Sequence, residues 1–166
     1  MSKAVILEDL ESIAVAVLSL RHKGSKVVFT NGCFDLLHVG HIRLLEEAKA
    51  QGDVLIVGLN SDSSVTALKG QSRPITTALE RAEILSMLRP VDYVFIFDDP
   101  TPIRLIRMIT PDVHVKGSEY RVGFGKHMPE ASVVESLGGR VHLVEMVKDR
   151  STSSIVCSLG NSGNIC

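Results

Sequence analysis

Residues 30–41 read TNGCFDLLHVGH, and this stretch decides more about the chain than any other. It follows the β-branched run 26–30, which predicts a strand, and it opens the run 40–50, which predicts a helix. His38 and His41 stand three residues apart at that helix start, so their rings can share one face. Gly40 between them lets backbone approach a ligand closely. Since free N–H groups and the dipole at a helix start favour phosphate, the stretch predicts a phosphate site.

Two other interpretations of the histidine pair have to be weighed. A zinc site normally needs three or four protein ligands, and no Cys or carboxylate is suitably spaced nearby. The rings could also merely cap the helix or pack. The preceding Asn-Gly-Cys-Phe-Asp and the strand-to-helix position favour phosphate, because two imidazoles there can donate to oxygens that gain charge in a transition state. No Walker A loop occurs, and Gly123-Phe124-Gly125 is no dinucleotide fingerprint, since Met128 replaces its third glycine.

Strand-like and helix-like segments alternate along the rest of the chain. This alternation predicts an α/β domain, a Rossmann-like open parallel five-stranded sheet with helices on both faces. We expect an amphipathic N-terminal helix packed on the core within residues 1–25, a single domain over 26–159 and a flexible tail over 160–166. The expected strands cover 26–30, 53–59, 91–97, 113–116 and 141–147, and the expected helices cover 7–21, 40–50, 78–88, 102–109, 129–137 and a segment after Ser151.

Composition excludes several classes of protein. The 166 residues suit one domain, and 45% hydrophobic with 22% charged residues argues against disorder. A net charge of -1, 4% aromatic residues and no Trp give no sign of a nucleic-acid partner. The three cysteines (Cys33, Cys157 and Cys166) show neither metal-ligand spacing nor a disulfide framework. With no visible signal peptide or membrane span, we expect a cytoplasmic protein.

Polar residues follow each predicted strand. In open parallel sheets ligands bind at the carboxyl ends of the strands, so these residues should gather at one edge. Loops are polar in any protein, and only the joint fit to one edge carries weight. The strand ends in question are Asn31-Gly32, Asn60-Ser61-Asp62, Asp98-Asp99, Lys116-Gly117 and the segment Lys148 to Thr152.

The chain resembles the HxGH nucleotidylyltransferase superfamily, which is cytidylyltransferase-like. Within it, the chain is most similar to D-glycero-β-D-manno-heptose 1-phosphate adenylyltransferases, the enzymes with ADP-heptose synthase activity. The HxGH pattern alone would also match class I aminoacyl-tRNA synthetases, which are far longer. The resemblance rests on VVFTNGCFDLLHVGH at 27–41, DVLIVGLNSDSSVTALKGQSRPI at 53–75, residues 79–94, TPIRLIRMITPDVHVKGSEY at 101–120, ESLGGRV at 135–141 and DRSTSSI at 149–155.

The resemblance implies a reaction. A sugar 1-phosphate oxygen attacks the α-phosphorus of a nucleoside triphosphate in line, and pyrophosphate leaves without a covalent enzyme intermediate. Catalysis is then positioning and charge stabilisation. The family usually uses Mg²⁺ held mainly by the triphosphate, so we expect Mg²⁺ with ATP and no dedicated metal ligands. Relatives are commonly dimers, which implies a homodimer.

The resemblance and the strand-end pattern together assign roles to residues. The expected catalytic residues are His38, His41, Lys69 and Arg73, the expected nucleotide-binding residues are Asn31, Gly32, Cys33, Phe34, Gly40, Lys116, Arg150, Ser151 and Thr152, and the expected substrate-binding residues are Asn60, Asp62, Arg81, Lys126 and His127.

Some of these residues have a structural interpretation as well. Lys69 and Arg73 could be solvated surface cations. Arg81 could pair with a carboxylate, and Ser151 or Thr152 could simply cap the last helix. Asn60 and Asp62 could form a turn. Cys33 is more typical of a small packed side chain than of a nucleophile.

The base and the acceptor stay open. This chain has Lys116-Gly117-Ser118-Glu119-Tyr120 where the family often has KGGDY, and RVGFGKHM at 121–128 is unusual for the heptose enzymes. The cytidylyltransferases for glycerol 3-phosphate carry Arg-Thr-x-Gly-Ile before Ser-Thr-Thr, which this chain lacks, and this favours ATP. The alternatives are a CTP-dependent cytidylyltransferase acting on glycerol 3-phosphate or another small phosphate, and a nucleotide-binding regulatory module without turnover.

Overall fold

A computed structural model describes residues 3–7, 9–120, 128–145, 147, 152 and 155–156. Six strands form one sheet in the order β1-β4-β3-β2-β5-β6, and every neighbouring pair is parallel. The runs of Val, Leu and Ile that make the inner strands are buried on both faces, as parallel sheets require. The strands are β1 (Val5–Leu7), β2 (Val27–Gly32), β3 (Val54–Asn60), β4 (Tyr93–Phe97), β5 (Val113–Gly117) and β6 (Arg140–Val144).

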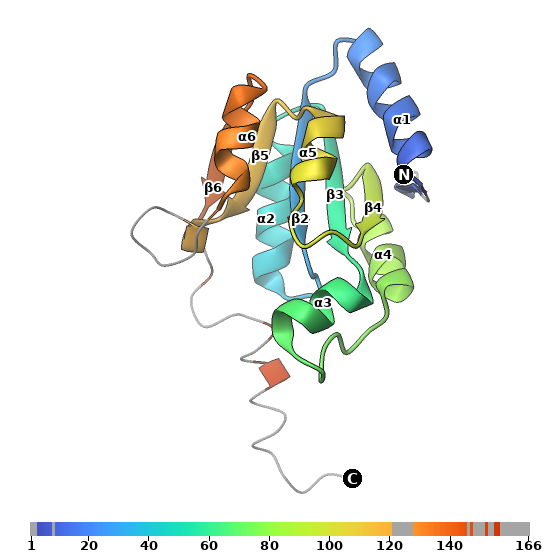
Figure 1. Cartoon of the computed structure of the whole chain (residues 1–166), viewed down its shortest axis with the longest axis vertical. Helices are drawn as coiled ribbons and strands as arrows, with labels where there is room; N and C mark the ends of the chain where they lie inside the picture. Colours follow the sequence, from blue (N-terminus) through green and yellow to red (C-terminus); the bar gives the residue numbers. More distant parts are fainter. Residues whose placement is uncertain are drawn as a thin grey trace, which may run out of the picture.

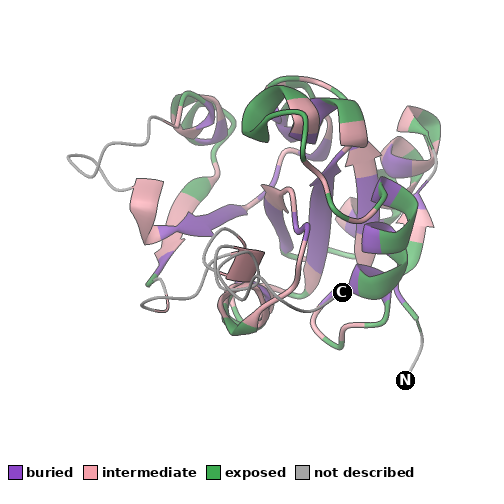
Figure 2. Cartoon of the chain, turned by 90° about the horizontal axis from the view of Figure 1, so that it is seen from below, coloured by how far each residue is buried: buried purple, intermediate pink, exposed green. Residues whose placement is uncertain are grey.

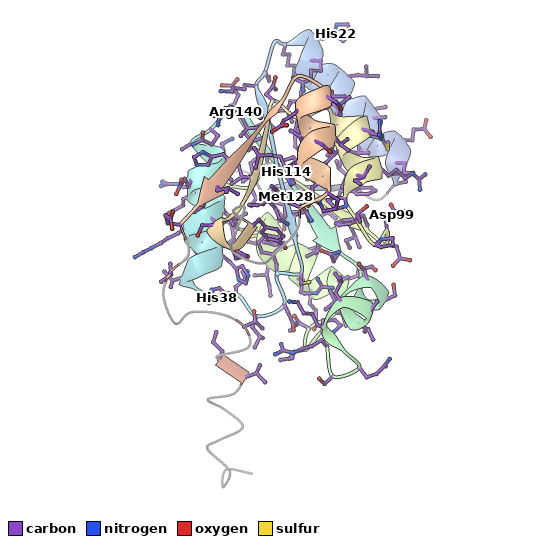
Figure 3. The ribbon with its side chains drawn as sticks, turned by 60° about the vertical axis from the view of Figure 1, so that its left-hand side comes forward. His22, His38, Asp99, His114, Met128 and Arg140 are labelled. Atoms are coloured by element: carbon purple, nitrogen blue, oxygen red, sulfur yellow. The ribbon has the colours of Figure 1, made fainter. Side chains whose placement is uncertain are left out.

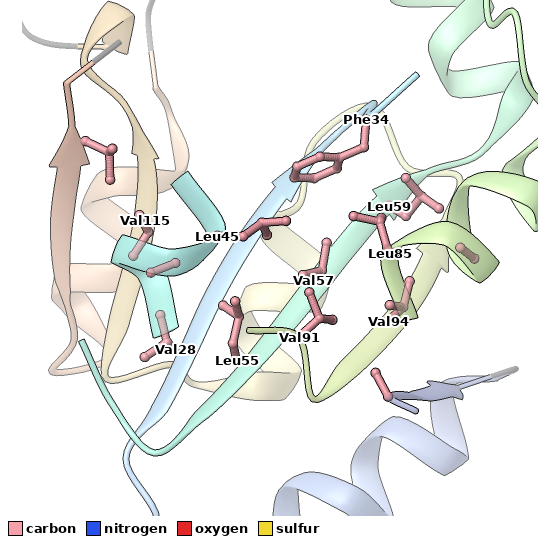
Figure 4. Packing of buried hydrophobic residues seen from close by; sticks show 14 of the residues in the cluster. Val28, Phe34, Leu45, Leu55, Val57, Leu59, Leu85, Val91, Val94 and Val115 are labelled. Atoms are coloured by element: carbon pink, nitrogen blue, oxygen red, sulfur yellow. The ribbon is translucent and has the colours of Figure 1, made fainter. Parts of the chain in front are cut away.

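Helices cover both faces of the sheet. Side chains of α1, α5 and α6 join a core cluster with Phe29 and Ile56, whereas α2 and α4 join the cluster on the other face (Figure 1). Figure 4 shows that second cluster, in which Leu45 and Leu85 reach down to Val57 and its neighbours. The helices are α1 (Leu10–His22), α2 (Val39–Lys49), α3 (Asp62–Lys69), α4 (Ala78–Ser86), α5 (Ile103–Ile109) and α6 (Glu130–Ser136), with a short 3₁₀ turn η1 (Ser118–Tyr120).

The strand order places a topological switch beside β2. The chain moves from β2 to β3 and then β4 on one side, and returns through α5 to β5 on the other side of β2. Ligands of open α/β sheets bind outside the carboxyl ends of the strands at such a point. Asn31 near the end of β2 and Lys116 near the end of β5 therefore flank the expected binding crevice.

The α/β sheet with helices on both faces is confirmed, with six strands where the sequence predicted five. The additional strand, β1, consists of only three residues, and it pairs with β4 so that Val5 lies opposite Tyr93. The sequence predicted a helix from residue 7, but α1 begins at Leu10, because Asp9 caps it and accepts a hydrogen bond from the Ser12 N–H at 2.7 Å.

Helix α3 was also missing from the sequence prediction, which considered a turn over Asn60 to Asp62. Ser61 is the N-cap of α3, and its hydroxyl accepts from the Ser64 N–H at 3.1 Å. Gly70 follows the helix with a φ of 98°, a conformation that favours glycine.

Burial follows the layers. Purple, buried residues fill the strands, and green, exposed residues lie on the outer helix surfaces (Figure 2). On α1, Ile13, Val17 and Leu20 face the core, whereas Leu18 is exposed. None of the helices among the described residues is long and apolar enough to cross a membrane. The tail expected over 160–166 lies outside the described residues.

Candidate active site

A cavity of about 800 Å³ opens at the carboxyl ends of β2, β3 and β5. Many of the residues singled out from the sequence line it, although they come from five separate stretches of the chain. The predicted site residues that the structure brings together here are Asn31, Gly32, Cys33, Phe34, His38, Gly40, His41, Asn60, Lys69, Arg73, Lys116 and Thr152. Asp62 and Arg81 do not line the cavity, and Lys126, His127, Arg150 and Ser151 lie outside the described residues.

The two histidines form a stacked pair at the start of α2. Their ring centroids lie 3.9 Å apart, and the ring of Phe34 lies 5.1 Å from that of His41. Figure 3 places His38 toward one end of the molecule and His22 at the other. Burial lowers the pKa of His38, and burial together with the neighbouring His38 lowers the pKa of His41 to about 4. Both rings are therefore neutral near pH 7.

His38 is also the N-cap of α2. Its Nδ1 accepts a hydrogen bond from the Gly40 N–H at 3.1 Å. Capping and lining the cavity are thus not alternatives for this residue, because one ring does both. With Nδ1 acting as acceptor, the proton of the neutral ring sits on Nε2, which becomes a donor. The Gly40 N–H, in contrast, is taken up by the cap.

The two cations expected to contact phosphates differ in environment. Lys69 ends α3 and is exposed at the cavity wall. Arg73 is not a solvated surface cation, since its Nη1 donates to Asp35 Oδ2 at 2.7 Å and both side chains are mostly buried.

Asp35 is a site residue to which the sequence analysis gave no role. Its Oδ1 accepts from the N–H of Ile75 at 2.8 Å and of Thr76 at 3.2 Å. Burial alone would raise the pKa of this carboxyl, but Arg73 and these two backbone donors hold it below its usual range. The sequence offered only a faint signal, a carboxylate inside the 30–41 stretch with a basic loop expected near the phosphates.

Arg81 is buried inside the protein, with its side chain 0% exposed. Its guanidinium donates to the carbonyl oxygens of Cys33 at 2.5 Å, Asn60 at 2.9 Å and Thr76 at 3.0 Å. It also pairs with the Asp62 carboxylate at 2.7 Å. The carboxylate partner that sequence spacing along α4 did not reveal is therefore supplied by α3, and Arg81 ties together the loops that frame the cavity.

A second group of residues lies around Asn31 near the end of β2 and Lys116 near the end of β5. Lys116 Nζ lies 3.3 Å from the Asn31 carbonyl oxygen and 4.5 Å from the centre of the Tyr120 ring. Burial raises the pKa of Tyr120 to about 12, so its hydroxyl stays protonated. Burial also raises the pKa of the Cys33 thiol, which makes this cysteine a poor nucleophile.

Two other predicted residues have identifiable partners. The Asn60 side-chain amide donates to Ser64 Oγ at 2.9 Å, which fixes the start of α3. Thr152 Oγ1 donates to the Leu36 carbonyl oxygen at 3.3 Å, so Thr152 lies beside the turn that leads into His38.

The part of the cavity wall formed by His38, His41 and Lys69 suits an anion better than a bare metal ion, although Glu119 and Glu130 also line the cavity. Among the described residues no group of three or more His, Cys, Asp and Glu side chains is arranged to hold a metal. The carboxylate of Asp35 already binds Arg73, and Lys69 and the histidine N–H groups match phosphate oxygens.

Known proteins are similar to this chain over most of its length. A cytidylyltransferase-like family model matches residues 29–157. The chain is 50% identical over 154 residues to the bifunctional protein HldE of Geobacter metallireducens, an alignment that covers 90% of this chain and 30% of the relative. It thus spans about a third of the length of the curated relatives it matches.

Two solved structures are also similar. A lipopolysaccharide core biosynthesis protein from Thermoplasma volcanium is 30% identical with a TM-score of 0.59, and the match covers 75% of this chain and 98% of that one. Pantoate-beta-alanine ligase from Francisella tularensis is 18% identical with a TM-score of 0.63, over 90% of this chain and 69% of that one. The second likeness shows the fold alone.

Proposed function

Because the chain belongs to the cytidylyltransferase-like family, we propose that it is a nucleotidyltransferase that forms a nucleotide-sugar from ATP and a sugar 1-phosphate. A phosphate oxygen of the sugar 1-phosphate forms a bond to the α-phosphorus, and the bond from the α-phosphorus to the bridging oxygen breaks. The electron pair leaves with pyrophosphate. We propose heptose 1-phosphate as the acceptor, on the resemblance of residues 27–41 and 53–75 to the heptose adenylyltransferases.

The observation that carries this proposal is the stacked His38–His41 pair at the start of α2, facing a cavity that Lys69 and Arg73 also line. Negative charge grows on the α-phosphate oxygens in the transition state. The neutral imidazoles supply N–H donors to those oxygens without abstracting a proton, which suits a reaction whose nucleophile is already an anion. Lys69 and Arg73 would hold the triphosphate.

Magnesium enters as part of the substrate. Mg²⁺ carried by the triphosphate would neutralise phosphate charge that otherwise repels the incoming sugar phosphate. On the enzyme side we propose that Arg150, Ser151 and Thr152 hold the distal phosphates. Thr152 lines the same cavity as His38, which supports this proposal.

The nucleoside end of the cavity is proposed to lie along Asn31 to Phe34, Lys116 and Tyr120. The sugar end would include Asn60, with Lys126 and His127 as further contacts. The similarity to a lipopolysaccharide core biosynthesis protein supports a sugar phosphate as acceptor, since a lipopolysaccharide core is a saccharide.

The decisive test is pyrophosphate release by the purified chain with Mg²⁺, using ATP and CTP in parallel against heptose 1-phosphate and glycerol 3-phosphate. We expect release only with ATP and heptose 1-phosphate together. Release with CTP and glycerol 3-phosphate would favour the cytidylyltransferase alternative. Nucleotide binding without release in any combination would favour a regulatory module and contradict the enzyme.

We also propose that the chain is a homodimer, as the resemblance implies. Exposed apolar side chains of α4, Leu79 and Ile84, and of its C-cap residue Met87 support a protein contact on that helix. Light scattering on the eluting peak of a sizing column measures the mass directly, and a monomer of 18.0 kDa would contradict the proposal.

A further inference from the structure

His114 is a buried titratable residue to which the proposed reaction gives no role. It is the second residue of β5 with 0% exposure, and its ring stacks on that of Phe29 with centroids 5.3 Å apart. Figure 3 labels it near the middle of the molecule. Burying a histidine in a parallel strand between valines costs free energy unless its ring nitrogens form hydrogen bonds.

One of those nitrogens contacts the cavity wall. His114 Nε2 lies 3.1 Å from Oδ1 of Asn31, which lines the cavity. Lys116 Nζ lies 3.4 Å from the same Oδ1. Because an ammonium group can only donate, the atom that faces both His114 and Lys116 has to be the amide oxygen of Asn31. The flipped amide would set its own N–H groups against the lysine.

This assignment fixes the tautomer of His114. If Asn31 Oδ1 is an acceptor, His114 Nε2 carries the proton and Nδ1 carries the lone pair. The structure agrees, because Nδ1 is buried and has no hydrogen-bond partner among the described residues. Burial and the Lys116 charge lower the pKa of His114 to about 3, so the ring is neutral near pH 7.

The nitrogen of the Asn31 amide, Nδ2, lies at the other end of the same group. The amide oxygen is held from behind by His114 and Lys116, while the described contacts include no partner for Nδ2. The two amide N–H donors are therefore left for the cavity.

We propose that His114 is a positioning residue, which holds the Asn31 carboxamide so that its amide N–H groups are offered to an acceptor atom of the bound nucleotide. This inference rests on the proposed function only for the identity of the ligand. The acceptor is either a phosphate oxygen or an atom of the nucleoside, and both would bind the same fixed donors. A hydrophobic residue at position 114 would leave Lys116 alone to orient the amide.

The first test needs no ligand. Nitrogen-15 spectra of the histidine rings in the full chain report the tautomer and charge of His114 between pH 5 and 8. We expect a neutral ring protonated on Nε2 throughout. A proton on Nδ1, or a titration near the ordinary pKa of 6.5, would overturn the proposal even if the protein turned out to bind no nucleotide.

The second test measures dissociation constants for Mg²⁺–ATP and for inorganic tripolyphosphate by calorimetry. His114→Leu should weaken ATP binding by about 3- to 10-fold, the scale of one hydrogen bond, with little change in kcat. His114→Gln, whose amide can still donate, should recover most of the loss. An effect that persists with tripolyphosphate assigns the contact to phosphate, and an effect seen only with ATP assigns it to the nucleoside.

Two controls separate positioning from general destabilisation. Val115→Ala removes buried atoms from the opposite face of β5 and should lower stability without changing ATP affinity. In the Asn31→Ala background, His114→Leu should cost nothing further. Additive losses in the double variant, or unchanged affinity in His114→Leu while Asn31→Ala weakens binding, would show that His114 does not act through Asn31.

Discussion

Arg73 Nη1 lies 2.7 Å from Asp35 Oδ2, which fastens the loop between α3 and α4 to the turn that leads into His38. Two backbone N–H groups of the same loop, at Ile75 and Thr76, also donate to Asp35. One carboxylate thus sets the position of a cation expected to hold phosphate. Arg73 is therefore held in place by Asp35 before any ligand binds.

Replacing Asp35 should therefore lower the stability of the fold. In Asp35→Ala a mostly buried guanidinium and two backbone donors lose their acceptor, and removing one partner of a buried pair costs about 3 kcal/mol. Urea unfolding monitored by circular dichroism measures the loss. The matched control is Glu135→Gln, which removes an exposed charge on α6 and should leave the midpoint unchanged. Equal midpoints for Asp35→Ala and the wild type would contradict the fastening role.

The dual position of His38 can be separated by two substitutions. His38→Ala removes both the cap and the ring, and should lower stability by about 1 kcal/mol and kcat by roughly 10²-fold. His38→Asn restores a good N-cap acceptor but no ring donor, so its stability should recover while kcat stays low. Thermal unfolding and steady-state pyrophosphate release on the same samples give the two readouts. Recovery of kcat in His38→Asn would mean that the ring only caps.

Much of the architecture followed from local pattern. Five of the six strands were predicted from short runs of Val, Leu and Ile that lie between segments of helical periodicity. Such continuous apolar runs are typical of parallel strands, which are buried on both faces. The edge at which polar residues gather was predicted because parallel strands bring their carboxyl ends together. Strand β1 was missed because three residues are too few to show an alternating pattern. Helix α3 was missed because the sequence does not distinguish a serine that caps a helix, as Ser61 does, from a serine in a turn.

The roles of individual polar residues depended on tertiary contacts instead. Nothing in the spacing along α4 indicates that Arg81 reaches three backbone carbonyls from separate loops. Asp35 accepts from residues about 40 positions away, and His114 contacts Asn31 from a strand 83 positions further on. Sequence pattern predicts which residues come near the cavity, but which of them contact the ligand and which hold their neighbours depends on packing distances.

Partial burial of His41 should make stability fall in mild acid. The folded pKa of His41, about 4, is below its ordinary 6.5, so between these values the unfolded chain binds a proton that the folded chain does not. Stability is therefore complete above about pH 6.5 and decreases as pH falls toward 4. The loss at pH 5 reaches up to about 2 kcal/mol. Urea midpoints of wild type and His41→Gln at pH 7.5 and 5.0 test this, and parallel pH profiles of the two proteins would contradict it.

Arg81 offers the sharpest choice between a substrate contact and a structural tie. If it binds substrate, Arg81→Met should raise KM and leave folding largely intact. The structure predicts instead a main effect on folding, because Met would leave the carbonyls of Cys33, Asn60 and Thr76 without their buried donor. We expect a loss on the order of 3–5 kcal/mol in the free energy of unfolding.

The matched control for Arg81→Met is Asp62→Asn. Asp62 is the partially exposed member of the same ion pair, and its replacement should cost below about 1 kcal/mol. Cys33 directly follows β2, and Asn60 ends β3. Loosening their carbonyls would also displace the turn that carries His38, and kcat should fall together with stability. A stable Arg81→Met protein with a raised KM and normal kcat would return Arg81 to the substrate site.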